Sequence, residues 1–331
     1  MANSNTATAI KKLVGYMALS AILLLMMPHL VGPYYIMLLS YGLIYAVAAI
    51  GFNLLLGYSG LLSFGHSAYF GVGAYTVSLM VKYMGVISME AFLVGGLIVS
   101  LTVTALFGYI CVRHTKIFFA ILTLALSQVL WSLAFKFFWV TGGTDGLRVP
   151  TATLLGGLIR APNKLAFISG TYYYYVLAIF LICVVLMWII VNSPFGRALQ
   201  AIRDNDIRAE FVGVRVKRYR WLAFMISGGF TGLAGALWAP LNGLTTPDIL
   251  HWTFSGELVF LTVLGGFKTF SGPIIGAVIF TFIKAYLIGF TVLWQLCLGV
   301  VLVIIVLTMP NGLIGTLARW ISKLKGGEKL K

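Results

Sequence analysis

The chain has 331 residues, of which 60% are hydrophobic and only 9% are charged. This composition excludes an ordinary soluble domain. The net charge of +15 does not indicate nucleic-acid binding, because the basic residues are spread over several loops and no nucleic-acid motif accompanies them.

Uncharged runs are long enough to cross a bilayer as helices, which takes about 20 residues. Residues 171–191 and 291–309 are two such runs. A helix satisfies its backbone hydrogen bonds within one segment, and the alternating pattern of a membrane strand barrel is absent. We therefore predict an all-α polytopic membrane protein, a single transmembrane domain over residues 1–331. About ten transmembrane helices are expected, at residues 13–31, 34–56, 67–84, 90–112, 117–140, 172–191, 221–241, 254–266, 273–290 and 291–309.

Glycines crowd the segment LLLGYSGLLSFGHSAYFGVGAY, residues 54–75. Glycine between apolar runs predicts an interrupted helix, which a membrane tolerates only where protein or a water-filled cavity covers the backbone. The segment therefore either packs closely against other helices or lines a transport pathway. Ser63 is a candidate cap of the third helix. The lone His66 is either a hydrogen-bonded structural residue or a pathway residue.

Three more polar residues are candidates for pathway lining. Asn53 lies near the inner end of the second helix and Gln128 lies within the fifth. A buried amide needs a partner, so each faces either another helix or a channel. Asp145 lies in the sequence TGGTDG, where a turn residue is the first interpretation and an outer-side acid the second.

The segment SPFGRALQAIRDNDIRAEFVGVRVKRYR, residues 193–220, holds seven basic and three acidic residues. Ser193 is expected to cap a short helix there. Asp204 or Asn205 is expected to cap a second one, which Gly213 closes.

The second short helix carries an apolar stripe, because Ile207 and Phe211 are four residues apart and share one face. Mixed charge beside such a stripe suits a protein groove better than an anionic lipid surface, whose ligands are usually basic. A merely solvated loop is the alternative.

The last third of the chain contains two charges inside apolar surroundings. Glu257 follows Ser255, a predicted cap, so its carboxylate meets a helix N-terminus favourably. Pathway lining is the other interpretation of Glu257. Lys284 is unusual in a span, and no motif accounts for it.

A faint repeat also extends through the chain. His66 and Gly71 recur as His251 and Gly256, 185 positions later. In the expected topology the two pairs lie on opposite sides of the membrane. This relation is typical of inverted repeats, here helices 2–5 and 7–10.

Charge also predicts the orientation. Ten helices place both termini on one side, and the positive-inside rule makes that side cytoplasmic. The cytoplasmic set then holds 17 of the 23 basic residues.

The stretch GRALQAIRDNDIRAEFVGVRVKRYRWLAFMISGGFTGLAGAL resembles the cytoplasmic loop and following helix of permeases in branched-chain amino acid ABC importers of the LivM/BraE type. The stretches at residues 54–75, VTGGTDGL at 140–147, LTVLGGFKTFSGPIIGA at 261–277 and PNGLIG at 310–315 are similar to the same family. The match covers residues 40–320, in the order expected of the family.

The resemblance implies a permease subunit in the bacterial inner membrane, with segment 193–220 as the loop that couples it to an ATPase. The residues expected to make that coupling contact are Arg203, Asp204, Asp206, Ile207, Glu210, Phe211 and Gly213. The implied partners are two ATP-binding subunits, a homologous second permease and a periplasmic substrate-binding protein, with membrane lipid around the chain.

The chain itself is not expected to be an enzyme. GGFKTFSG at 265–272 lacks the spacing of a phosphate loop, and no nucleophile–base or metal constellation is visible. No metal or cofactor is expected. Branched-chain or related small apolar amino acids are the default substrate, with urea, amides or aromatic acids as alternatives within the family. An ion-coupled secondary transporter is the alternative class, and it needs a carboxylate within the membrane.

Overall fold

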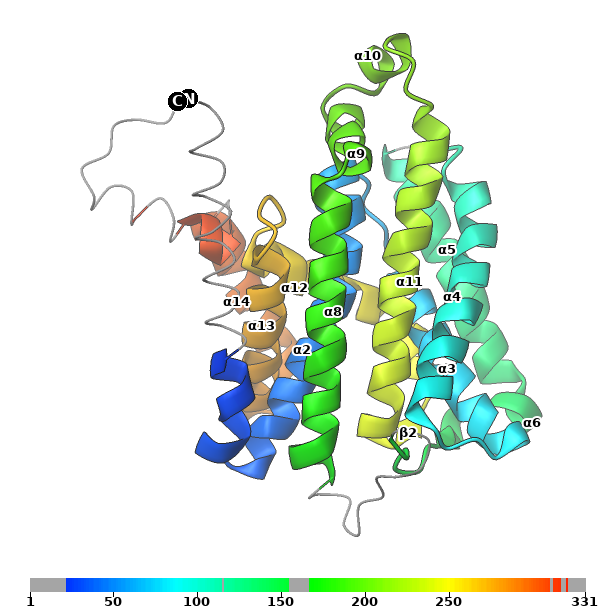
Figure 1. Cartoon of the computed structure of the whole chain (residues 1–331), viewed down its shortest axis with the longest axis vertical. Coiled ribbons are helices and arrows are strands. Elements are labelled where there is room, and N and C mark those ends of the chain that lie inside the picture. Colours follow the sequence, from blue (N-terminus) through cyan, green and yellow to red (C-terminus); the bar gives the residue numbers. More distant parts are fainter. Residues whose placement is uncertain (1–21, 115, 155–166, 310–311, 317–319, 321–331) are drawn as a thin grey trace.

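The computed structural model describes residues 22–114, 116–154, 167–309, 312–316 and 320. Most of the described chain is helical, and the helices run along the long axis of the molecule (Figure 1). Within this part of the chain, six segments are long and apolar enough to cross a membrane: Pro33–Ser59, Met89–Cys111, Ile117–Lys136, Ile168–Asn192, Val216–Asn242 and Gly272–Phe290. The predicted all-α polytopic membrane class is therefore confirmed.

The long helices lie close to their predicted positions. They are α2 (Pro33–Asn53), α3 (His66–Met84), α4 (Met89–Cys111), α5 (Lys116–Lys136), α8 (Tyr173–Asn192), α11 (Val216–Asn242) and α13 (Gly272–Phe290). Two shorter apolar helices, α12 (Trp252–Gly265) and α14 (Trp294–Thr308), complete the set. Residues 22–30 are also helical, and the rest of the predicted first helix lies outside the described residues.

Short elements gather at the two ends of the molecule. The upper end in Figure 1 carries α9 (Pro194–Asp204) and α10 (Asp206–Phe211), which we call the α9–α10 unit. The lower end, which we call the strand end, carries α6 (Phe138–Thr141), η2 (Gly143–Asp145), β1 (Leu147–Arg148) and β2 (Leu244–Thr245). The two strands pair antiparallel, with Leu147 opposite Thr245.

The core is built around α11, which packs against α2, α3 and α4. Small residues permit this close approach. A side chain at Gly235 would collide with the carbonyl of Phe70 in α3, and one at Gly232 would collide with the side chain of Ser100 in α4. These glycines therefore allow helix backbones to meet where any larger residue would separate them.

The predicted interruption between the second and third helices is present. The last turn of α2 widens into a π-helix, η1 (Leu54–Ser59), and Gly60 has a left-handed φ of 72°. An irregular stretch follows, and α3 begins only at His66. Since His66 contacts Ser227 in the middle of α11, the start of α3 lies deep among the helices.

Several boundaries differ from the sequence prediction. The predicted fifth helix, residues 117–140, is divided into α5, which ends at Lys136, and the short helix α6. Helix α11 begins at Val216 rather than residue 221, so the last five residues of the predicted 193–220 loop are helical. Helix α12 has 14 residues and begins at Trp252 rather than residue 254. At 1.5 Å per residue it is about 21 Å long, which is shorter than a bilayer core of about 30 Å.

Helix α12 is reached by an irregular connection. The chain leaves the strand end after β2, passes through the 3-10 helix η5 (Pro247–Leu250) and enters α12. A second short π-helix, η4 (Ile168–Tyr172), precedes α8.

Candidate functional site

The N-terminal ends of α3 and α12 meet in the interior of the helix bundle. The amide of Ser67 donates to Ser255 Oγ at 2.8 Å, and the Ser255 hydroxyl donates to Ser67 Oγ at 2.8 Å. The Ser67 hydroxyl in turn donates to the Leu250 carbonyl at 3.0 Å. Both serines are fully buried. The predicted role of Ser255 as a cap is wrong, because the N-cap of α12 is His251 and the Ser255 hydroxyl joins the two helices instead.

His66 is held by hydrogen bonds on both sides of its ring. Nδ1 lies 2.9 Å from Ser63 Oγ, and Nε2 lies 2.7 Å from Ser227 Oγ. The ring is fully buried and meets the edge of Phe52 at a centroid distance of 4.8 Å. Both ring nitrogens are hydrogen-bonded, so this arrangement offers no free nitrogen to a ligand and favours the structural interpretation of His66.

The interaction with His66 also corrects the prediction for Ser63. The N-cap of α3 is Gly65, which has no side chain, and the first-turn amide of Ser67 is bound by Ser255 of α12 instead. Ser63 lies outside the helix and orients the imidazole. The signal that sequence reasoning lacked was Ser227, which lies 161 residues from His66 along the chain.

The two amide candidates contain polar atoms that lack a hydrogen-bond partner within the described residues. These atoms are Asn53 Oδ1 and Gln128 Nε2, and both are buried. Gln128 lines a groove along α5, with Ser132 and Lys136 beyond it. An unsatisfied buried amide is costly, so each marks a place where a water, a ligand or a further chain would contribute.

The start of α12 is open on one side. Trp252 is 46% exposed, and a side chain at Gly256 would meet no atom within 4 Å. His251 connects this region to α5, because its ring lies 5.2 Å from the ring of Trp131. Asp145 does not belong to this region. It is exposed in η2, where its amide donates to the Gly142 carbonyl at 3.1 Å, as expected of a turn residue.

Glu257 and Lys284 form an ion pair between α12 and α13. Lys284 Nζ donates to both carboxylate oxygens, at 2.7 and 2.6 Å. The side chains are only 21% and 22% exposed, and Lys284 Nζ also lies 5.3 Å from the centre of the Trp294 ring. The pair therefore accounts for the lysine that no motif explained. Glu257 lies in the second turn of α12, so its partner is Lys284 rather than the helix N-terminus.

The α9–α10 unit has the caps that its sequence predicts. Ser193 Oγ accepts from the amide of Gly196 at 3.4 Å at the start of α9. Asn205 Oδ1 accepts from the amide of Arg208 at 2.9 Å at the start of α10, so Asn205 rather than Asp204 is the cap. Gly213 follows α10 with a φ of 88° and turns the chain toward α11.

The outer surface of α10 is apolar. Ile207, Phe211 and Val212 are 65%, 88% and 78% exposed. The opposite side is anchored by a small cluster of Ile202, Ala209 and Val216, which joins α9, α10 and α11. The unit is thus fixed from within and presents bare hydrophobic side chains outward, as a docking element does.

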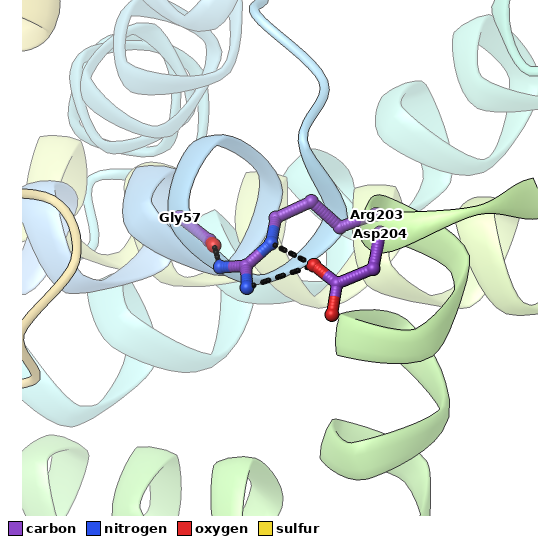
Figure 2. Close-up of polar contacts among 3 residues, drawn as sticks. All are labelled: Gly57, Arg203 and Asp204. Atoms are coloured by element: carbon purple, nitrogen blue, oxygen red, sulfur yellow. Dashed lines mark hydrogen bonds and ion pairs between the residues drawn. The ribbon is translucent and has the colours of Figure 1, made fainter. Parts of the chain in front are cut away.

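The predicted coupling residues separate into two groups. Arg203 and Asp206 are engaged with other parts of the chain, although their side chains are 38% and 46% exposed. The Arg203 guanidinium donates to the Gly57 carbonyl at 2.6 Å and to Asp204 Oδ1 at 3.1 and 3.2 Å (Figure 2). Ile207, Glu210 and Phe211 are exposed.

Asp206 forms an ion pair of 3.1 Å with Arg220 of α11. The hydrogen bond from Arg220 lowers the pKa of the Asp206 carboxyl below its ordinary value. This pair fixes the start of α10 to the start of α11.

Comparison with known proteins places these features in a family. The sequence profile described as branched-chain amino acid transport system / permease component matches residues 34–307. The chain is 28% identical over 303 residues to the "High-affinity branched-chain amino acid transport system permease protein LivM" of Salmonella typhimurium, covering 86% of this chain and 71% of the relative. The Escherichia coli protein of the same name is 27% identical over 307 residues, with the same coverage.

A relative with another substrate in its name also matches. The "Guanosine ABC transporter permease protein NupQ" of Bacillus subtilis is 29% identical over 210 residues, covering 60% of this chain and 64% of that protein. No solved structure gave a significant match.

Proposed function

Because this chain belongs to the family of permease components of branched-chain amino acid transport systems, we propose that it is the membrane-spanning subunit of a binding-protein-dependent ABC importer. In this role it forms the translocation pathway for branched-chain or related small apolar amino acids. It performs no chemistry itself, and ATP hydrolysis takes place on partner subunits.

The observation that carries this proposal is the apolar tip of the α9–α10 unit. The side chains of Ile207 and Phe211 are exposed at this tip, and so is the neighbouring Glu210. A soluble partner with an apolar groove would cover this tip and be oriented by the surrounding charges. Movement of that partner during ATP binding and hydrolysis would then reach the helices through residues 193–220.

The proposed topology has ten transmembrane helices with both termini in the cytoplasm of a bacterial inner membrane. The α9–α10 unit then lies inside and the strand end lies outside. The concentration of basic residues at 193–220 supports this orientation. Helices 2–5 and 7–10 are proposed as inverted repeats, supported by α3 and α12, whose starts meet at Ser67 and Ser255.

The proposed assembly contains two ATP-binding subunits, a homologous second permease and a periplasmic substrate-binding protein. The open face at Trp252 and Gly256, together with the groove along α5 that Gln128 lines, supports a second membrane subunit beside α5 and α12. A polar side chain such as Gln128 on a membrane-spanning helix needs to face protein or water rather than lipid. The relative named as a guanosine permease shows that substrate varies among similar chains, so substrate is tested directly.

The test of the proposal is purification of the tagged chain expressed with its genomic neighbours, followed by mass spectrometry and uptake assays in vesicles. We expect two ATPase copies, a second permease, and uptake of leucine, isoleucine or valine that requires ATP and the binding protein. Repeated recovery of the chain alone in mild detergent, with uptake that needs no ATP, would reject the importer. Uptake of guanosine in place of these amino acids would keep the importer and change its substrate.

The alternative, an ion-coupled secondary transporter, would use Glu257, since this carboxylate lies within the helices beside Lys284. The double substitution Glu257→Gln with Lys284→Met removes both titratable groups. An ATP-driven importer keeps its dependence on ATP in this variant, whereas an ion-coupled transporter loses its dependence on the ion gradient.

A further inference from the structure

Arg203 is the last arginine of α9, yet its side chain turns away from the exposed tip of the α9–α10 unit. One guanidinium nitrogen donates to the Gly57 carbonyl at 2.6 Å, and the other two nitrogens face Asp204 Oδ1 (Figure 2). The contact joins residues 146 positions apart. It directly connects the α9–α10 unit to the interrupted end of α2.

The Gly57 carbonyl needs such a donor. It belongs to η1, the last turn before the chain leaves the helix, where carbonyls lack partners from the following turn. A cation at a helix C-terminus satisfies these oxygens and interacts favourably with the helix dipole. The bond is also charge-assisted, which makes it stronger than a neutral one.

Gly60 accommodates the inner part of this side chain, which is 38% exposed overall. A Cβ at Gly60 would lie 2.7 Å from Arg203 Cγ, so the glycine accommodates the aliphatic part of the side chain. On its other side Gly57 lies against the Phe267 carbonyl, in the connection between α12 and α13. The end of α2 is therefore confined between α9 and that connection, and a displacement of α9 must either carry η1 along or break the bond.

We propose that Arg203 is a positioning residue that transmits movement of the α9–α10 unit to the interrupted end of α2, and that it does not contact the ATPase. This inference rests on the proposed function, because it assigns the step that follows docking. Docking belongs to the exposed Ile207 and Phe211, and transmission belongs to Arg203 and the carbonyl it holds. The two tasks separate in experiment.

The test uses the whole importer with Arg203→Met, which keeps the aliphatic stem against Gly60 and removes every donor. We expect unchanged recovery of the ATPase and a rate of ATP hydrolysis within about twofold of that of the unmodified complex. Uptake per ATP hydrolysed should fall about tenfold or more, which is the factor expected for losing a hydrogen bond from a charged group. Arg203→Lys, which keeps one charged donor, should restore part of the ratio. Arg197→Met on the exposed side of α9 is the matched control and should leave the ratio unchanged.

Two results would overturn the inference. Reduced ATPase recovery with Arg203→Met would make Arg203 a docking contact, and an unchanged ratio of uptake to hydrolysis would make its bond to Gly57 irrelevant to transport. An unchanged unfolding midpoint of the variant in detergent separates lost transmission from a damaged fold. If the unmodified chain does not co-purify with an ATPase, the proposed function is rejected. That result is seen before any variant is compared, so it is distinct from a failure of this inference.

Discussion

The α9–α10 unit and the α12–α13 helix pair both carry charged side chains, but they use charge in opposite ways. In α12 and α13, Glu257 and Lys284 neutralise each other at 2.6 Å and are about one-fifth exposed. In the α9–α10 unit some charges are paired internally while Glu210 and Arg208 remain exposed beside an apolar tip. A membrane interior tolerates only charge that is cancelled locally, whereas a docking surface needs charge that a partner can reach.

The ion pair gives the largest predicted effect. Glu257→Gln leaves the Lys284 ammonium without its partner between two apolar helices. We expect the free energy of unfolding to fall by about 3 kcal/mol, the low end for a buried pair, because the two side chains are about one-fifth exposed and removing one leaves an uncompensated charge. Denaturant unfolding of the purified chain in mild detergent measures this loss.

The double variant Glu257→Gln with Lys284→Met is the control for that prediction. Removing both charges should restore most of the lost stability, since a buried pair and an apolar replacement of similar volume are often close in energy. Equal destabilisation in the single and double variants would show that the packing around the residues matters and their charges do not.

Phe211 gives the second largest effect, and on binding rather than on folding. Phe211→Ala should weaken ATPase binding by about 2 kcal/mol, as expected for an aromatic anchor at an interface. The free energy of unfolding of the isolated chain should change by less than about 0.5 kcal/mol, because the side chain is 88% exposed. Titration of the purified ATPase against the detergent-solubilised chain measures the binding.

Trp139 is the matched control for Phe211. It is 86% exposed and lies in α6 at the strand end of the molecule. Trp139→Ala should leave ATPase binding unchanged. Equal loss of binding in the two variants would contradict the assignment of docking to the α9–α10 unit.

The same contrast explains what the sequence could predict. Runs of apolar residues predict spans because a bilayer imposes length and composition on every crossing helix. The caps Ser193 and Asn205 were also predictable, since a cap depends on residues within four positions. In the same way Ile207 and Phe211 share a face because of helical periodicity alone.

Contacts between distant segments were not predictable. Glu257 and Lys284 were each singled out, but nothing in the sequence joined them, because a pairing across two helices depends on how those helices rotate and pack. Ser255 is misassigned for the same reason, because its hydroxyl bonds Ser67, which is 188 residues away. Ser63 is a local error, because its hydroxyl bonds the His66 ring three residues later and does not cap the helix. The sequence groups Arg203 with the docking residues because it lies among them in the charged segment. Its bond to the Gly57 carbonyl joins residues 146 positions apart, so no local pattern predicts it.

Asn205 offers a smaller effect that tests whether the α9–α10 unit must be preformed. Asn205→Ala removes the bond to the Arg208 amide and should destabilise α10 locally by about 1 kcal/mol. Hydrogen exchange of the α10 amides measures this opening. Asn205→Asp keeps an accepting oxygen and should exchange at the original rate, so equally fast exchange in both variants would argue against the cap.

The ion pair of Asp206 with Arg220 gives the smallest effect, and it appears only in acid. Arg220 lowers the pKa of the Asp206 carboxyl, so the native state favours the ionised form more than the unfolded chain does. The stabilisation is therefore fully present above the ordinary aspartate pKa and is lost as pH falls through the lowered value. Because the Asp206 side chain is 46% exposed, solvent screens the interaction and the gain is at most about 1 kcal/mol.

Asp206→Asn should remove this acid dependence while leaving the cap at Asn205 in place. The measurement is hydrogen exchange at the α10–α11 junction between pH 3 and pH 6, corrected for the intrinsic pH dependence of exchange. An unmodified chain should open more easily toward the acid end, and the variant should show a flat profile. The same acid sensitivity in both proteins would place its origin in another carboxylate.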